Sequence, residues 1–299
     1  MKVGSVKPHS GYIRETIFDN GRTVMRHLRN KARRKDTLVI TFAEMMMNDP
    51  SKPGFAQDFL IKNGFDVVTV QKTSENWYQD LKISHFRRAV SRLSPGYSNM
   101  YCYGISMGAF ASLYFGGSVN ASLIAISPLC SIHPLYPKLG APEHRKTVSA
   151  TQVDLGETII GQGSALIIYD PLSRSDRLYI EEEVRPAFPD ACYALAPGTG
   201  HPSSASLKEM GMLQRIVLET IEAGPSKQIR NDIRQFRANS HSYLVRMAEY
   251  SLRSGRAEQA MQLIANLREA ATQDERTMER CESIRRQIET RAAKQAVNL

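Results

Sequence analysis

The chain has 299 residues, of which 42% are hydrophobic and 23% charged, a mixture that supports one large domain or one domain plus a small one. No apolar run is long enough to cross a membrane, and residues 1–20 lack the apolar stretch of a secretory signal. The net charge of +9 is concentrated at the ends: residues 1–36 carry ten basic and three acidic side chains, and residues 226–299 carry fourteen and nine. Because no aromatic-interleaved RNA motif accompanies these charges, we expect solvated basic faces and no nucleic-acid partner.

The cysteines give no sign of a disulfide framework or a metal site. Cys102, Cys130, Cys192 and Cys281 are far apart and form no CxxC motif, which is typical of a protein from a reducing compartment. The chain also lacks the GxxxxGK[ST], HExxH and calcium-loop motifs. We therefore expect a cytoplasmic protein that holds no metal and no organic cofactor.

After residue 36, apolar and β-branched runs alternate with segments of helical spacing. The runs predict strands at residues 37–42, 65–70, 99–103, 121–126, 165–169 and 191–195. Helices are predicted around residues 59–61 and at 76–93, 107–115, 176–184 and 207–222. Alternating strands and helices favour an α/β fold with a mostly parallel sheet that is covered on both faces.

The sequence changes character after residues 223–226 (AGPS), which we interpret as a domain boundary. Residues 1–224 then form the main domain, with 1–36 as a basic N-terminal extension, and residues 225–299 form a C-terminal helical segment. Within that segment, residues 243–267 resemble a single tetratricopeptide-like helical hairpin with its turn at Ser254-Gly255. Because one hairpin cannot bury its own apolar face, we expect it to contact the main domain or a protein partner.

Residues 104–108 (GISMG) match the G-x-S-x-G pattern between a predicted strand and a helix rich in small residues. In such a turn the serine takes a strained conformation, and the flanking glycines let the strand and the helix approach each other. Ser106 is therefore the candidate nucleophile, and the backbone N–H of Met107 is a candidate donor to a developing oxyanion. A second donor is expected from residues 42–44 (FAE), where Ala43 is the smallest candidate.

Enzymes with such a turn carry an acid and then a histidine later in the chain. His201 is the candidate base, because it lies on a glycine-flanked loop (APGTGHP) between the last predicted strand and the last helix. The acid is expected after the strand at 165–169, where both Asp170 and Asp176 qualify. Asp176 is favoured because it opens the next helix, whereas Asp170 is suited to holding its own loop through backbone contacts.

These residues resemble the α/β-hydrolase superfamily over residues 37–222, which implies an α/β-hydrolase fold and a serine esterase or O-acyltransferase. Ser106 then matches the nucleophile, His201 the base, and Asp176 or Asp170 the acid. The segments YGISMGAFASLYFGG, GFAQDFLIKNGFDVV and NWYQDL are similar to hydrolase-like proteins of bacterial surface-polysaccharide loci and to accessory-secretion proteins of glycan O-acetylation. This narrower resemblance implies a small acyl group such as acetyl, carried on a polysaccharide or glycan.

Two further expectations concern the substrate and the role of the chain. Trp77 and Tyr78 follow the strand at 65–70, where an aromatic pair would stack on a sugar ring, although packing is an equally good role for Trp77. The alternative to an enzyme is a non-catalytic, hydrolase-like protein that binds a partner in polysaccharide biosynthesis or export through its C-terminal helices.

Overall fold

The computed structural model describes residues 11–31, 36–139, 142–270 and 275–297. Eight strands form one sheet in the order β1-β2-β4-β3-β5-β6-β7-β8. β2 is antiparallel to both of its neighbours, whereas β4, β3, β5 and β6 run parallel. The strands are β1 (Tyr12–Asp19), β2 (Thr23–Asn30), β3 (Thr37–Phe42), β4 (Asp66–Lys72), β5 (Asn99–Ile105), β6 (Ser122–Ile126), β7 (Ala165–Tyr169) and β8 (Cys192–Leu195).

The helices follow the strands in alternation and then continue alone to the C-terminus. They are α1 (Gln57–Lys62), α2 (Ile83–Ser91), α3 (Met107–Gly116), α4 (Pro142–Thr147), α5 (Arg174–Tyr179), a π-helical turn η4 (Ile180–Val184), α6 (Arg185–Ala187), α7 (Ser204–Glu209), α8 (Leu213–Ala223), α9 (Ile229–Phe236), α10 (His241–Arg253), α11 (Ala257–Ala270) and α12 (Glu275–Val297). The helix predicted at 207–222 is thus two helices, with Gly211 at φ +71° between them.

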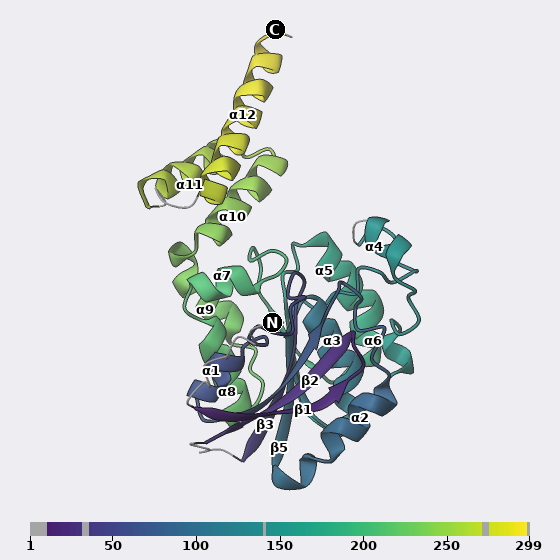
Figure 1. The fold of residues 1–299 in the computed structure, drawn as a ribbon. Helices are drawn as coiled ribbons and strands as arrows, with labels where there is room; N and C mark the ends of the chain where they lie inside the picture. The colour runs from purple at the N-terminus through teal and green to yellow at the C-terminus, as the bar shows by residue number, and fades with distance from the viewer. Residues whose placement is uncertain (1–10, 32–35, 140–141, 271–274, 298–299) are drawn as a thin grey trace, which may run out of the picture. The chain divides into compact units, whose positions relative to one another are not determined.

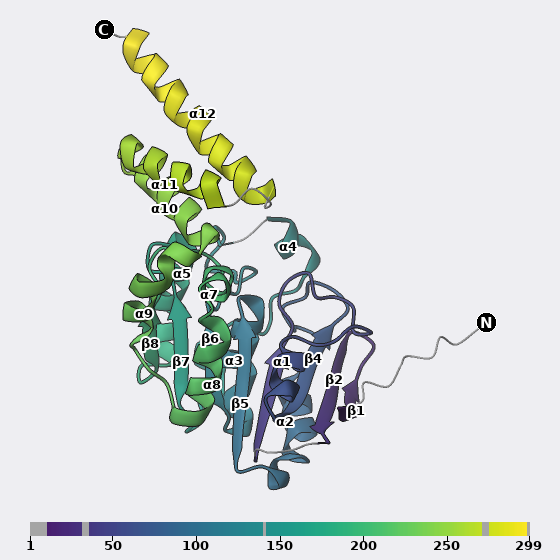
Figure 2. The ribbon, with the colours of Figure 1, turned by 90° about the vertical axis from the view of Figure 1, so that its left-hand side faces the viewer.

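β3 and β4 are buried along their whole lengths, as the apolar run of β3 predicts, and β4 buries the polar residues Asp66, Gln71 and Lys72 as well. On one face of the sheet the Phe42 ring lies 5.8 Å from Phe86 of α2 and 5.9 Å from Phe115 of α3, measured between ring centroids. α1 lies on the opposite face from α2 and α3 (Figure 2). The sheet therefore has helices on both faces.

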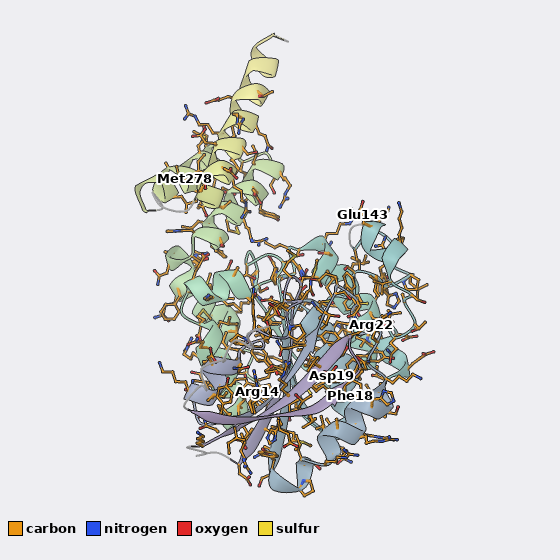
Figure 3. All side chains as sticks on the ribbon, viewed as in Figure 1. Arg14, Phe18, Asp19, Arg22, Glu143 and Met278 are labelled. Carbon is orange, nitrogen blue, oxygen red and sulfur yellow. The ribbon has the colours of Figure 1, made fainter. Side chains whose placement is uncertain are left out.

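No strand was predicted before residue 37, and this prediction is wrong. β1 and β2 form a hairpin that joins the edge of the sheet. Its turn contains Asn20-Gly21, with Gly21 at φ +79° and the Asn20 side chain accepting from the Thr23 N–H at 2.7 Å. Phe18 of β1, labelled in Figure 3, lies 5.6 Å from the His85 ring of α2. The excess of basic residues hides this hairpin, although Asn-Gly between two extended segments is a turn signal.

The predicted C-terminal hairpin is present as α10 and α11, with a turn that contains Gly255 at φ +78°. α12 lies against both helices, so three helices share one apolar core (Figure 1). That core consists of Val245, Ala248, Leu252, Ala260, Ile264, Leu267, Cys281 and Ile284. The hairpin therefore covers its apolar face with the helix that follows it in the same chain.

The chain forms two compact units, one comprising residues up to Ile167 with Leu178–Cys192, the other Ile168–Arg177 with the residues from Tyr193 onward. We call them the first and the second unit; the domain boundary expected near residue 224 stays a prediction. The strand order, with its antiparallel second strand and parallel centre, is that of the α/β-hydrolase fold, followed here by C-terminal helices. Among the described residues, no helix combines the length and the apolar character that a membrane span requires.

Candidate active site

Ser106 lies in the first unit, at the sharp turn between the end of β5 and the start of α3. Its backbone has φ +52° and ψ −114°, a conformation that L-residues rarely adopt and that costs on the order of 1–3 kcal/mol. The Ser106 N–H donates to the Ile126 carbonyl at 2.9 Å, and the Ser106 carbonyl accepts from the Phe110 N–H at 3.0 Å. Bonds to β6 and to α3 therefore hold the strained serine in place.

Both glycines of the GISMG motif are required by the close approach of backbone atoms. A Cβ on Gly104 would lie 2.1 Å from the Gly108 carbonyl oxygen, and a Cβ on Gly108 would lie 2.5 Å from the Phe42 carbonyl oxygen. The second contact brings the start of α3 against the end of β3. This is the steric reason for the glycines that the sequence pattern implies.

Met107 is the first residue of α3, so its backbone N–H has no acceptor within the helix. Ala43, the other residue expected to donate to an oxyanion, is placed differently. Its N–H donates to the Val70 carbonyl at 3.1 Å, and Ala43 is 1% exposed. The expectation for Ala43 is therefore corrected, because its N–H already completes the pairing of β3 with β4.

The loop after β3 is held by residues that the sequence did not single out. The Glu75 carboxylate accepts from the Met46 N–H at 2.5 Å and from the Asn48 side chain at 2.7 Å. Lys72, which is fully buried, forms an ion pair with Glu75 at 3.1 Å. Burial lowers the pKa of Lys72, and the neighbouring Glu75 partly offsets this. No sequence pattern marks the contacts of Glu75 with Met46 and Asn48, because they join two loops about 30 residues apart.

Trp77 and Tyr78 do not present their rings for sugar stacking. Their side chains are 1% and 0% exposed, and both residues have positive φ in the turn that precedes α2. The Tyr78 hydroxyl donates to the Ala43 carbonyl at 2.6 Å, and its ring lies edge-on to Phe42. The expected substrate contact is therefore corrected to a packing role, in which Tyr78 holds the peptide at the end of β3.

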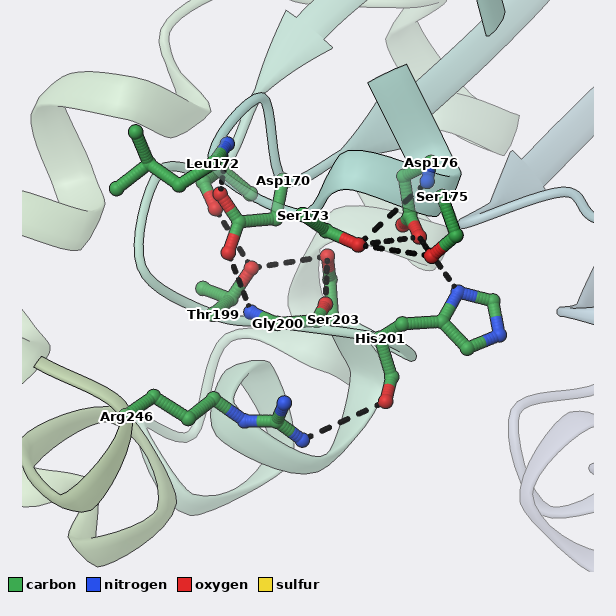
Figure 4. Close-up of polar contacts among 11 residues, drawn as sticks. Asp170, Leu172, Ser173, Ser175, Asp176, Thr199, Gly200, His201, Ser203 and Arg246 are labelled. Atoms are coloured by element: carbon green, nitrogen blue, oxygen red, sulfur yellow. Dashed lines mark hydrogen bonds and ion pairs between the residues drawn. The ribbon is translucent and has the colours of Figure 1, made fainter. Parts of the chain in front are cut away.

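His201 and Asp176 lie together in the second unit, where Nδ1 of His201 is 2.8 Å from Oδ1 of Asp176 (Figure 4). Asp176 is completely buried, whereas the His201 side chain is 23% exposed. Because a carboxylate oxygen accepts hydrogen bonds, this contact favours the imidazole tautomer with its proton on Nδ1, which leaves Nε2 as an acceptor. The same Asp176 oxygen accepts from the Ser173 hydroxyl at 2.8 Å.

The position of Asp176 follows from the start of α5. Ser173 precedes the helix, its carbonyl accepts from the Arg177 N–H at 3.0 Å, and its hydroxyl bonds Asp176 three residues on. This is the S/T-x-x-acid pattern of a helix start. Ser173 was missed as a supporting residue, but the Ser-Arg-Ser-Asp sequence carries that signal.

Asp170 faces the backbone of its own loop and of the His201 loop (residues 196–203). Its two oxygens accept from the N–H groups of Leu172, Gly198 and Gly200 at 2.8, 3.0 and 2.7 Å. Burial raises the pKa of Asp170, and these three N–H groups partly offset the rise. Asp170 thus ties the end of β7 to the loop that carries His201.

α10 packs directly on the His201 loop. Gly198 and Gly200 have φ +85° and +74°, and a Cβ on Gly200 would lie 1.9 Å from a guanidinium nitrogen of Arg246. Another nitrogen of Arg246 lies 3.5 Å from the His201 carbonyl oxygen, as Figure 4 shows. Glu209 of α7 also caps the start of α10, accepting from the Ser242 N–H at 2.9 Å. Nothing in the sequence links Arg246 to a residue 45 positions earlier.

A second buried polar cluster lies in the first unit. Nε2 of His133 is 3.5 Å from Glu183, which also accepts from the Tyr136 hydroxyl at 3.2 Å and the Leu155 N–H at 2.9 Å. Among the described residues, no group of three or more His, Cys, Asp or Glu side chains is arranged to hold a metal ion.

Comparisons with known proteins find similarity in solved structures only; no family model and no curated protein matches the sequence. Est1E from Butyrivibrio proteoclasticus is 14% identical with a TM-score of 0.46, covering 71% of this chain and 100% of that one. The capsule O-acetyltransferase of Neisseria meningitidis serogroup A is 15% identical with a TM-score of 0.46, covering 69% and 93%. An esterase of Pyrococcus furiosus is 13% identical with a TM-score of 0.47, covering 71% and 91%.

Proposed function

We propose that the protein is a serine acyl-transfer enzyme in which Ser106, His201 and Asp176 form the catalytic triad. The hydrogen bond between His201 and a fully buried Asp176 carries this proposal, because it fixes the imidazole tautomer that a serine nucleophile requires. The strained backbone of Ser106 supports it, because residues in such rarely populated conformations cluster at active sites.

In this mechanism the imidazole Nε2 takes the Ser106 proton while Oγ attacks an ester carbonyl. Asp176 stabilises the imidazolium that forms, and the Met107 N–H donates to the developing oxyanion. The acyl group then sits on Ser106 while the alcohol leaves with the proton from His201. Water or a second hydroxyl attacks the acyl-enzyme by the reverse sequence of proton transfers.

A fluorophosphonate probe tests the nucleophile directly. We expect the wild-type protein to be labelled and Ser106→Ala to remain unlabelled, while the matched variant Ser118→Ala is labelled like wild type. Circular dichroism of all three proteins controls for folding. Equal labelling of wild type and Ser106→Ala would show that Ser106 is not the nucleophile, and a well-folded wild type that no probe labels would favour a non-catalytic, partner-binding protein.

We further propose that the acyl group is small, with acetyl on a glycan hydroxyl as the leading candidate. The support is the sequence resemblance of residues 103–117 (YGISMGAFASLYFGG), which contain the turn at Ser106, to proteins of surface-polysaccharide loci and glycan O-acetylation. We call this turn, residues 104–108, the elbow. Acetyl, butyryl and octanoyl p-nitrophenyl esters test the size preference. We expect kcat/KM to fall as the chain lengthens, and a clear preference for octanoyl would exclude a small-acyl enzyme.

A further inference from the structure

A cavity of about 460 Å³ lies within the second unit, bounded by the loop after β7, the His201 loop and α10. This volume is in the range of pockets that hold small organic ligands. Charged side chains make up a large part of its lining. Asp170, Arg174, Arg246, Glu249 and Arg253 are charged, and His201 also lines the cavity.

The three arginines of the cavity have no carboxylate of their own. None of Arg174, Arg246 and Arg253 forms an ion pair within the part of the chain that the structure describes. The Nε atom of Arg246 is also buried without any hydrogen-bond partner. Burial and the nearby Arg280 lower the pKa of Arg246, and attraction from Glu249, Asp170 and Asp176 only partly offsets this, so a bound anion would stabilise the charge of Arg246 further.

The two carboxylates that line the cavity are already engaged by other groups. Asp170 accepts three backbone N–H groups, as described above. Glu249 accepts two hydrogen bonds from Arg280, at 2.8 and 3.0 Å. Glu249 and Asp170 therefore act on Arg246 only through longer-range attraction and form no ion pair with it, and the cavity has three guanidinium groups against two carboxylates.

We propose that this cavity binds a phosphate or carboxylate group of the ester substrate. The planar guanidinium groups of Arg174, Arg246 and Arg253 present the donor geometry that such anions accept. An anion bound to Arg246 would lie against the loop that positions His201, because the Arg246 guanidinium already contacts Gly200 and the His201 carbonyl. The substrate claim rests on the proposed function, whereas the anion site does not.

Binding of inorganic phosphate to Ser106→Ala, measured by isothermal titration calorimetry, tests the site without catalysis. We expect one phosphate per chain, bound roughly tenfold more weakly or worse when Arg174→Gln or Arg253→Gln is added. Arg234→Gln removes a guanidinium from the exposed side of α9 and should leave phosphate affinity unchanged. No binding, or an equal effect of all three arginine substitutions, would overturn the anion site.

A matched pair of esters tests whether the anion is part of the substrate. 4-Acetoxybenzoate carries a carboxylate, and 4-acetoxybenzamide is its neutral isostere. We expect the wild type to favour the benzoate in kcat/KM, and Arg174→Gln or Arg253→Gln to lower the ratio of the two values about tenfold. Arginine-dependent phosphate binding with equal turnover of both esters would overturn the substrate claim. The same binding without turnover of any ester would instead refute the proposed function and leave the anion site standing.

Discussion

The Asp176 carboxylate and the His201 imidazole meet at 2.8 Å in the interior of the second unit, although 25 residues separate them in the sequence. Two sets of local hydrogen bonds hold the segments that carry them. The Ser173 hydroxyl donates to the same carboxylate oxygen at the start of α5, and Asp170 accepts from the Gly198 and Gly200 N–H groups of the His201 loop. The two aspartates therefore have different neighbours, one an imidazole and the other backbone N–H groups.

This difference predicts how amide substitutions at the two positions will rank. Asp176→Asn should lower kcat on p-nitrophenyl acetate by on the order of 10⁴-fold, because an amide that donates to the imidazole favours the wrong tautomer. Asp170→Asn should act mainly on stability, since it replaces a carboxylate that accepts three N–H bonds. Steady-state kinetics together with thermal unfolding separates the two effects. The reverse ranking in kcat would identify Asp170 as the triad acid.

The close contact between Gly108 and Phe42 predicts a steric requirement at the elbow. In Gly108→Ala the added Cβ would meet the Phe42 carbonyl at 2.5 Å, and neither backbone can move without disturbing β3 or α3. We expect a loss of about 1–3 kcal/mol in unfolding free energy, together with lower activity. Gly96→Ala is the matched control, because its Cβ would meet nothing within 4 Å. A Gly108→Ala protein as stable and active as the control would show that the elbow relaxes easily.

The parts of the fold that the sequence predicted are those with a strong local signal. Continuous apolar runs marked the central strands, and the GISMG motif marked the elbow between β5 and α3. The β1–β2 hairpin was missed because its faces mix charged and apolar residues, as in Arg26 and His27 beside Met25 and Leu28. Such an edge hairpin has no continuous apolar run, so the local sequence pattern does not reveal it.

In the candidate site too, the residues with a local sequence signal were predicted and those held by long-range contacts were not. Ser106, His201 and both aspartates could be selected from motif, loop composition and chain order. Long-range contacts carry no such signal, which is why Arg246 on the His201 loop and Glu75 on the β3 loop were missed. For Trp77 the sequence left a sugar contact and a packing role equally open, because only contacts with the rest of the chain decide whether a ring is exposed.

Tyr78 is predicted to be a positioning residue for the loop after β3. Its hydroxyl donates to the Ala43 carbonyl at 2.6 Å. The carbonyl groups of Phe42 and Ala43 lie close to Gly108, two residues after Ser106. Tyr78→Phe leaves that buried carbonyl without this donor, so we expect a loss of about 1–3 kcal/mol in stability. If the loop shapes the oxyanion site, kcat should also fall while KM changes little. A drop in stability with unchanged kcat would restrict Tyr78 to a packing role.

Glu183 is expected to make the unfolding free energy depend on acid pH. Burial favours a raised pKa for Glu183, but the contacts from His133, the Leu155 N–H and the Tyr136 hydroxyl outweigh it and hold the pKa below its usual 4.5. A carboxyl with a lower pKa in the folded state stabilises the protein fully above the unfolded value, and this stabilisation is lost as the pH falls through the folded pKa. Glu183→Gln should therefore flatten the decline in unfolding free energy between about pH 5 and pH 3, measured by urea unfolding. Glu157→Gln, which removes an exposed carboxylate, should keep the wild-type slope. An unchanged slope in Glu183→Gln would mean that the His133–Glu183 contact contributes nothing to the acid sensitivity of the fold.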